Sequence, residues 1–333
     1  PRLEQLKSWV AGLGAAWSID PDSCAPASAD ASFRRYFRVR TGHPTHPTAI
    51  VMDAPPAHED CRPFIHVARL FGDAGVTVPT VLAQDLAQGF LLLADLGSET
   101  YLSRLDDASA RPLYGDAATA LVRIQLATRP GELPAYDQAL LQRELDLFPQ
   151  WYVAKHLGVT LDARQQADLR EVFDTILANN LAQPQVYVHR DYHSRNLMVS
   201  TPNPGILDFQ DAVHGPITYD LMSLLRDAYI EWPEERVIDW CIRYWEMARR
   251  ASLPVAADFG EFYRAFEWMG VQRQLKVVGI FARLSARDGK DGYLADQPRV
   301  MRYLKRACRR YIALTPLAKL LDELDPTDPG DPV

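Results

Sequence analysis

In the first hundred residues, stretches with helical spacing of hydrophobic positions alternate with stretches of strand-like spacing. At 2–17 they lie three and four residues apart, as on one face of an α-helix. Alternating or short continuous apolar runs predict strands at 32–40, 49–52, 76–82 and 90–93, with an amphipathic helix at 60–74 between the second and third. This order predicts a small, mostly antiparallel N-terminal lobe.

Beyond residue 96 the apolar spacing is helical almost throughout. Helices are predicted at about 99–127, 137–157, 161–181, 218–230, 234–251, 258–284 and 297–313. Three short apolar pieces at 186–188, 197–199 and 205–207 interrupt them and predict a small sheet with loops at its ends. We therefore expect an α+β protein with an N-terminal lobe at 1–96 and a mostly helical lobe at 97–333.

Composition narrows the class of protein. The 333 residues are 47% hydrophobic and 24% charged, as in ordinary globular proteins, and the net charge of −7 disfavours a nucleic-acid binder. The four cysteines form no Cys-x-x-Cys pair, and no apolar run is long enough for a signal segment or a membrane span. We expect a cytoplasmic monomer that binds small molecules, with no nucleic-acid or membrane partner.

One segment of the sequence contains candidate catalytic and metal-binding residues. Val188-His-Arg-Asp-Tyr-His-Ser-Arg-Asn-Leu197 places Asp191 five residues before Asn196, and Asp208 ends the apolar run at 205–207. Phosphoryl transfer from a metal-bound nucleotide needs a carboxylate that orients the acceptor hydroxyl and oxygen ligands for the metal. Asp191 fits the first role, while Asn196 and Asp208 offer hard oxygen ligands to Mg²⁺. The spacing therefore predicts a kinase.

These residues resemble the catalytic loop and metal-binding segment of aminoglycoside phosphotransferase-type small-molecule kinases, which are distant relatives of protein kinases. Gly215-Pro-Ile-Thr-Tyr-Asp220-Leu is also similar to that family, whose next helix begins with a buried Asp that holds the catalytic loop. The resemblance implies a bilobal protein-kinase-like fold, with ATP and Mg²⁺ as cofactors. It also implies that backbone groups of Ala94 and Leu96 bind adenine at the hinge.

The N-terminal lobe departs from the family pattern. The lysine expected on the third strand is absent, since Met52 stands near its place, and there is no glycine-rich loop. Either nucleotide binding is weakened, as in a pseudokinase, or Arg34, Arg35 or Arg38 supplies the missing positive charge. A planar guanidinium can contact two phosphate oxygens at once. Because the three catalytic positions of the other lobe are intact, we favour an active enzyme with Arg34 and Arg35 at the nucleotide.

Further segments resemble the anomeric amino-sugar kinases of bacterial cell-wall recycling. They are Val51-Met-Asp-Ala-Pro-Pro56, Ser223-Leu-Leu-Arg-Asp-Ala-Tyr229, Gly279-Ile-Phe-Ala-Arg-Leu284 and Tyr293-Leu-Ala-Asp296. This resemblance implies phosphorylation of the C1 hydroxyl of N-acetylmuramate and N-acetylglucosamine, giving the α-1-phosphate. A kinase of an aminoglycoside, choline, homoserine or a thiosugar is the alternative, and a non-catalytic nucleotide-binding module is another. A protein kinase is disfavoured, because the short interval between Asp211 and Asp220 leaves no room for an activation loop.

The acceptor is expected beside the catalytic loop. A sugar hydroxyl bound to Asp191 would lie near polar residues of the loop and the metal segment. The candidate contacts are His193, Arg195, Gln210, Asp211 and Asp227. Residues 258–310 contain twelve Lys or Arg and six Asp or Glu, a local balance of +6 within a chain of −7. This balance disfavours a cationic acceptor and favours a neutral or carboxylate-bearing one, unless these charges only solvate helix faces.

Overall fold

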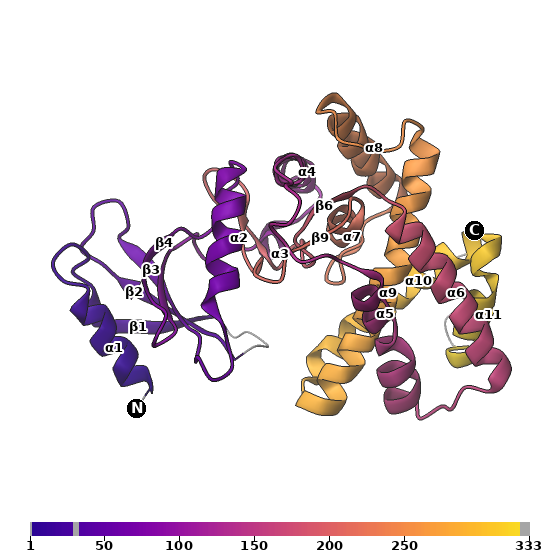
Figure 1. The fold of residues 1–333 in the computed structure, drawn as a ribbon, viewed down its shortest axis with the longest axis horizontal. Helices are drawn as coiled ribbons and strands as arrows, with labels where there is room; N and C mark the ends of the chain where they lie inside the picture. The colour runs from indigo at the N-terminus through magenta and orange to yellow at the C-terminus, as the bar shows by residue number, and fades with distance from the viewer. Residues whose placement is uncertain (1, 29–32, 327–333) are drawn as a thin grey trace. The chain divides into compact units, whose positions relative to one another are not determined.

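The computed structural model describes residues 2–28 and 33–326, and the chain forms two compact units (Figure 1). The N-terminal unit comprises Pro1–Arg104 and Asn196–Asp211, and the C-terminal unit comprises Leu105–Arg195 and Ala212–Val333. The division thus differs from the predicted boundary at residue 96. The metal segment returns to the N-terminal unit, because Thr77 and Thr100 form backbone bridges to Gly205 and Met198.

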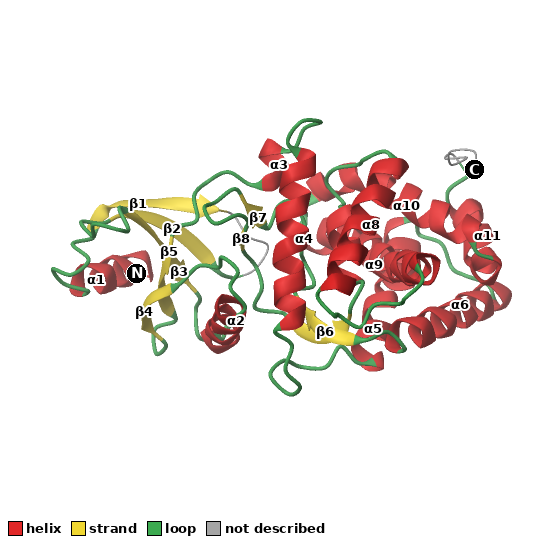
Figure 2. Ribbon diagram, turned by 90° about the horizontal axis from the view of Figure 1, so that it is seen from above, coloured by secondary structure: helices red, strands yellow, loops and turns green. Residues whose placement is uncertain are grey.

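An antiparallel five-stranded sheet forms the N-terminal unit, in the spatial order β1-β2-β3-β5-β4 (Figure 2). The strands are β1 (Asp20–Ser28), β2 (Arg35–Arg40), β3 (Thr48–Asp53), β4 (Val81–Asp85) and β5 (Phe90–Ala94). The predicted strand at 76–82 is wrong over most of its length. Strand β1 was not predicted, since its sequence Asp-Pro-Asp-Ser-Cys-Ala-Pro-Ala-Ser lacks an apolar alternation. Its prolines are tolerated because β1 is an edge strand.

Two helices longer than a single turn belong to the N-terminal unit. Helix α1 (Arg2–Gly12) places Leu6 and Val10 on inward residues of β2, β3 and β5, which form one hydrophobic core. Helix α2 (Cys61–Asp73) begins at Asp60, whose carboxylate accepts the backbone N–H of Arg62 as an N-cap. The ring of Phe64 lies 4.8 Å from that of Phe209, which anchors the returning metal segment beside α2.

The C-terminal unit is mostly helical. Its α-helices are α4 (Ala110–Leu126), α5 (Gln138–Leu145), α6 (Ala163–Leu181), α7 (Tyr219–Leu225), α8 (Glu234–Arg250), α9 (Phe259–Asp288), α10 (Gln297–Arg310) and α11 (Thr315–Leu324), with the short helix α3 (Tyr101–Arg104) preceding them in the other unit. The helices predicted at 99–127 and 137–157 are each divided, and the second continues as a π-helix, η1 (Phe148–His156). Helix α11 was not predicted.

The expected single small sheet is wrong, because two separate two-stranded sheets occur. Strand β6 (Gln185–Val188) pairs with β9 (Val213–Pro216), and β7 (Leu197–Met198) pairs with β8 (Gly205–Ile206). The first pair belongs to the C-terminal unit and the second to the N-terminal unit. The catalytic segment therefore leaves β6 in one unit and enters β7 in the other.

Helix α9 is the longest helix among the described residues and runs through the C-terminal unit (Figure 1). It starts with Asp258 as N-cap and ends at Gly289, whose φ of 65° is left-handed. Despite its 30 residues, none of the helices in the described part of the chain is both long and apolar enough to cross a membrane. Its packing on η1 is close at Gly279, where an added Cβ would lie 2.5 Å from the backbone carbon of Leu147.

We expect Gly279→Ala to destabilise the C-terminal unit, because the backbone of Leu147 cannot rotate away as a side chain would. Overpacking of this kind costs roughly 1–3 kcal/mol of unfolding free energy. The matched control is Gly115→Ala in α4, where an added Cβ meets no atom within 4 Å. That change is expected to stabilise by roughly 0.5–1 kcal/mol. Urea denaturation monitored by circular dichroism measures both, and equal effects would contradict the packing argument.

Candidate functional site

The catalytic loop is held by a buried carboxylate at the start of α7. Asp220, which is 1% exposed, accepts the backbone N–H groups of His189 (2.6 Å) and Arg190 (3.0 Å). This arrangement agrees with the role that the resemblance implied for Asp220. Burial raises the pKa of Asp220 to about 6, although the nearby His189 acts against the shift. Arg190 adopts a left-handed backbone with φ of 79°, so the loop turns sharply before Asp191.

A buried ion cluster lies behind the loop. Glu144 of α5 forms ion pairs with Arg190 (2.5 Å) and with Lys276 of α9 (3.1 Å), and it accepts the hydroxyl of Tyr136. Burial alone would lower the pKa of Lys276, but Glu144 outweighs it and raises that pKa. Burial would likewise raise the pKa of Glu144, which Lys276 and Arg190 instead lower. All three groups are therefore charged at neutral pH.

Asp191 is half-buried within this positive environment. Its backbone N–H donates to Nδ1 of His189 at 3.2 Å, which fixes the direction of the residue. Burial alone would raise the pKa of Asp191, but neighbouring positive charges, with Lys276 the strongest, lower it to about 2. The carboxylate is thus ionised across the physiological pH range, as a group that orients an acceptor hydroxyl requires.

The end of the loop is held by a second buried carboxylate. Asp227, predicted as a substrate contact, accepts the backbone N–H groups of Ser194 and Tyr229, both at 2.8 Å. His193 is buried, and burial lowers its pKa to about 4, so the imidazole is neutral at pH 7. Its Nδ1 is buried without a hydrogen-bond partner in the described residues. Asp227 therefore positions the loop, and His193 keeps a ring nitrogen available for a ligand.

Arg195, another predicted substrate contact, has a different environment. Its side chain is exposed, and its guanidinium carbon lies 3.6 Å from the ring centroid of Tyr229 and 5.8 Å from that of Tyr293. A guanidinium stacked on aromatic faces is restrained without losing its hydrogen-bond donors. His193 contacts the same Tyr229 ring edge-on at 5.3 Å. The two predicted residues are thus brought together around Tyr229.

The predicted metal ligands meet in the N-terminal unit. Asn196 Nδ2 lies 3.4 Å from Asp208 Oδ2, and the backbone N–H of Leu207 donates to the carbonyl of Asn196 at 2.9 Å. Asp208 has a left-handed φ of 60°, and Gln210 Nε2 donates to its Oδ1 at 2.9 Å. Gln210 also approaches Asp211, at 3.4 Å. Gln210, predicted as a substrate contact, therefore orients the carboxylate of Asp208, which is a predicted metal ligand.

This donor set suits Mg²⁺. An amide oxygen and a carboxylate are hard ligands, and Mg²⁺ is commonly bound by one or two protein oxygens together with phosphates and water. Within residues 2–28 and 33–326, no group of three His, Cys, Asp or Glu side chains is arranged to hold a metal. A complete protein cage is not needed at a site where the nucleotide supplies further oxygens.

The predicted hinge is tied to β2. Arg38 donates to both carboxylate oxygens of Asp95, at 2.6 and 3.0 Å, and to the carbonyl of Gly97 at 2.8 Å. The backbone N–H of Ala94 donates to the carbonyl of Thr80 at 2.9 Å. The N–H of Ala94, a predicted adenine contact, is therefore already engaged within the N-terminal unit. Arg38, one of three candidate phosphate ligands, is engaged at the hinge.

The remaining candidate arginines also have carboxylate partners. Arg35 donates to the buried Asp53 at 2.5 Å, and Arg34 lies 3.7 Å from Glu59. Met52, which stands near the expected strand lysine, is fully buried in β3. Arg35 is 48% exposed, whereas the side chain of Arg34 is 10% exposed. A phosphate would thus have to share or displace one of these carboxylates.

Two contributors to the loop were missed by sequence reasoning, Glu144 and Lys276. Both lie far from the loop in the chain, and neither belongs to a short motif. The available signal was a lysine within the apolar run Leu275-Lys-Val-Val278, since a charge in a buried helical position needs a partner.

A surface depression of about 380 Å³ bordered by Glu59, Cys61 and Gly89 includes none of the predicted site residues.

Comparison with known proteins agrees with this geometry. The phosphotransferase enzyme family matches residues 23–253, more than half of the sequence. The chain belongs to this family. Its relatives include the N-acetylmuramate/N-acetylglucosamine kinase of Pseudomonas aeruginosa, which is 50% identical over 330 residues and covered to 97% on each side. The kinase of the same name from Neisseria meningitidis serogroup B is 52% identical over 327 residues, covering 97% of this chain and 96% of the relative.

Solved structures of the phosphotransferase family share the fold. The crystal structure of the ADP-bound aminoglycoside phosphotransferase APH(2'')-Ib matches with a TM-score of 0.58 and 13% identity, covering 90% of this chain and 95% of that one. The predicted α+β, protein-kinase-like fold is thereby confirmed, as is the prediction of a phosphotransferase.

The raised pKa of Asp220 leads to a prediction about pH. Protonation below about pH 6 turns one carboxylate oxygen into a donor facing a backbone N–H, so kcat should fall on the acid side with an apparent pKa near 6. Asp191, with a pKa of about 2, stays ionised over that range. Asp220→Asn should therefore lower kcat at pH 7.5 and remove this acid limb.

The measurement is the ratio of variant to wild-type kcat from pH 5 to 8, because the ratio cancels protonation of the nucleotide. Exposed Asp239→Asn is the matched control and should keep the wild-type profile. Since the folded pKa of Asp220 exceeds its ordinary 3.8, its deprotonation between about pH 4 and 6 reduces the unfolding free energy. The unfolding free energy of Asp220→Asn should lack this pH-dependent contribution. An acid limb of kcat that is unchanged in Asp220→Asn would contradict the assignment of that limb to Asp220.

Proposed function

We propose that this protein transfers the γ-phosphoryl group of ATP to the C1 hydroxyl of N-acetylmuramate and N-acetylglucosamine, giving the sugar α-1-phosphate. The carrying observation is the ionised Asp191 on a loop whose preceding residues, His189 and Arg190, are held by Asp220. The Glu144 cluster supports the same loop. The two relatives at 50% and 52% identity are kinases named for these two sugars, and their likeness extends over nearly the whole chain.

The residues divide into roles in this reaction. Asp191 accepts a hydrogen bond from the acceptor hydroxyl and takes its proton late in the transfer. Asn196 and Asp208 would hold Mg²⁺, which would supply positive charge to the phosphate oxygens. Backbone groups of Ala94 and Leu96 bind adenine. Arg195, like His193, faces the acceptor in this proposal.

Phosphate binding in the N-terminal unit needs a replacement for the missing lysine. We assign it to Arg35 with Arg34 beside it, since Arg35 is the more exposed of the two. Asp211 remains a proposed acceptor contact, because it is exposed and adjacent to Gln210. The proposal also includes a cytoplasmic monomer without nucleic-acid or membrane partners, whose oligomeric state size-exclusion chromatography with light scattering would measure.

Product identity tests the proposed reaction. Incubation with Mg-ATP and each sugar should give a ³¹P resonance of an anomeric phosphomonoester, split by coupling to H1 of an α-configured sugar. A panel containing an aminoglycoside, choline, homoserine and a thiosugar serves as the comparison. Turnover of a panel member with no sugar 1-phosphate at high enzyme concentration would refute the proposal.

Asp191→Asn tests the role of the carboxylate. The amide cannot accept the proton, so kcat should fall by roughly 10²–10⁴-fold, the usual contribution of a positioned acid or base. Nucleotide affinity, followed by calorimetry, should stay within error of wild type because Asp191 is assigned to the acceptor. Asp239→Asn is again the control, and full activity of Asp191→Asn would support a non-catalytic module instead.

A further inference from the structure

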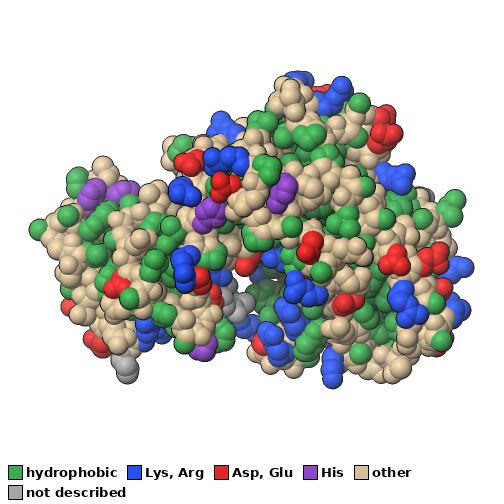
Figure 3. Space-filling view, viewed as in Figure 1, with side chains coloured by type: hydrophobic (Ala, Val, Ile, Leu, Met, Phe, Trp, Pro, Cys, Tyr) green, Lys and Arg blue, Asp and Glu red, His purple; other side chains and the backbone are tan. Residues whose placement is uncertain are grey.

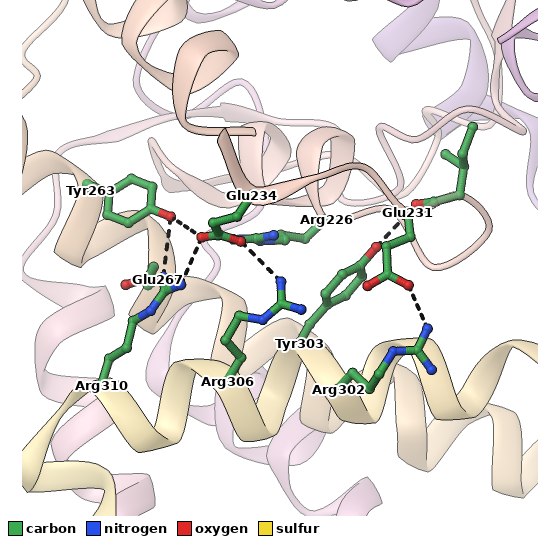
Figure 4. A network of polar contacts seen from close by, with 10 residues as sticks. Arg226, Glu231, Glu234, Tyr263, Glu267, Arg302, Tyr303, Arg306 and Arg310 are labelled. Atoms are coloured by element: carbon green, nitrogen blue, oxygen red, sulfur yellow. Dashed lines mark hydrogen bonds and ion pairs between the residues drawn. The ribbon is translucent and has the colours of Figure 1, made fainter. Parts of the chain in front are cut away.

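The excess of positive charge near the C-terminus of the chain is mostly neutralised. Glu234 of α8 accepts hydrogen bonds from Arg226, Arg306 (3.1 Å) and Arg310 (3.0 Å), and Arg310 also binds Glu267 (Figure 4). Other pairs in this region are Arg299–Asp296, Arg302–Glu231, Lys305–Asp325, Arg309–Asp322 and Arg287–Asp288. Basic and acidic side chains are interspersed on the visible face (Figure 3). The charge count at 258–310 therefore indicates internal ion pairs rather than a broad anion-binding surface.

Arg273 of α9 differs from these cations. Arg273 is only 4% exposed. No hydrogen bond or ion pair joins its guanidinium to any residue in the described ranges 2–28 and 33–326. Lys276, one turn later on the same face, has both a carboxylate and a hydroxyl partner. Burying an ionised group without a partner is costly, and arginine cannot lose its charge to avoid that cost. An unpaired buried guanidinium therefore indicates a site for an anion.

The packing of α9 locates this guanidinium. Gly270, one turn before Arg273, lies against Met222 of α7, where an added Cβ would be 2.5 Å from the methyl carbon. One turn after it, Lys276 donates to the hydroxyl of Tyr219, also in α7, at 3.1 Å. The face of α9 that carries Arg273 is thus bracketed by contacts with α7, the helix whose first turn holds the catalytic loop.

Charge interactions connect Arg273 with the loop itself. After burial and the stronger effect of Lys276, the charge of Arg273 contributes to the low pKa of Asp191. It also contributes, after burial, to the low pKa of His193. The buried Nδ1 of His193 is likewise without a hydrogen-bond partner among the described residues. Two buried groups that lack partners in the described residues therefore act electrostatically on the loop that carries Asp191.

We propose that Arg273 binds a carboxylate of the acceptor and so favours N-acetylmuramate over N-acetylglucosamine, an inference that rests on the function proposed above. The two sugars differ at C3, where N-acetylmuramate carries a lactyl ether that ends in a carboxylate. A guanidinium binds a carboxylate through two parallel hydrogen bonds, and burial strengthens the pair. The neutral ring of His193 binds a hydroxyl that both sugars share.

An oxyanion near Asp191 has a second source, the transferred phosphoryl group. Both sources offer paired oxygens to a guanidinium, so shape alone does not separate them. They differ in what loss of Arg273 does to the two acceptors. A phosphoryl contact serves both reactions equally, whereas a lactyl contact serves only one of them.

The test compares the two sugars with Arg273→Gln and Arg273→Met, the second of which keeps most of the side-chain volume without a buried polar group. For N-acetylmuramate, kcat/KM should fall about 10- to 100-fold, chiefly through KM, as expected for loss of a charge-assisted pair. For N-acetylglucosamine it should stay within about twofold, which also shows that the variants are folded. Arg264→Gln, at an exposed position of the same helix, should leave both values unchanged.

Calorimetric binding of each sugar in the presence of a non-hydrolysable nucleotide provides a readout without turnover. An Arg273-dependent preference for the carboxylate-bearing sugar supports the inference, even if neither sugar is phosphorylated and the proposed function fails. An equal loss for both sugars, with unchanged thermal stability, overturns it in favour of a phosphoryl contact. Wild-type protein that binds both sugars equally, with no effect of the substitutions, also overturns it.

Discussion

The carboxylate of Glu144 links helix α5 to the catalytic loop and to helix α9 in the C-terminal unit. It binds Arg190 of the loop and Lys276 of α9, so one buried negative charge faces two buried positive charges. Such an imbalance is unfavourable in a low-dielectric interior unless another anion lies nearby. Asp191 provides that anion, and the same field lowers its pKa. The ionisation of Asp191, the proposed catalytic group, therefore depends on the cluster. Removing Glu144 would disturb both the cluster and the charge state of Asp191.

In the N-terminal unit, too, arginine side chains pair with carboxylates. Arg35 and Arg38 are bound to Asp53 and Asp95 inside the unit. These pairs hold β2 to β3 and to the end of β5, where a kinase would use a lysine for phosphate. Guanidinium groups engaged in this way can contact an added anion only by sharing or exchanging partners, because their donors have fixed geometry. Under the proposed assignment of Arg35 to the phosphates, nucleotide binding would be coupled to the internal pairing of the strands.

Local patterns in the sequence were sufficient for features with short-range causes. Helix α2 follows from apolar spacing and its Asp60 cap, and the loop from Asp191 to Asp208 follows from spacing and resemblance. Strand β1 was missed because it is stabilised by pairing with β2 rather than by its own composition. The partners of Arg190 and the isolation of Arg273 depend on which side chains meet across the fold. Such long-range contacts leave no periodic pattern in the sequence. Only the folded structure therefore distinguishes Arg273 from its paired neighbours.

The ion pair between Arg38 and Asp95 restrains the predicted hinge. Because Arg38 also holds the carbonyl of Gly97, the backbone from 94 to 97 has its conformation before any ligand arrives. Adenine binding at this hinge, as proposed, would then cost little chain entropy, and the fixed backbone would disfavour bases with a different edge. In the proposed function, the choice of base would therefore be set by hydrogen bonds within the protein, before the nucleotide binds.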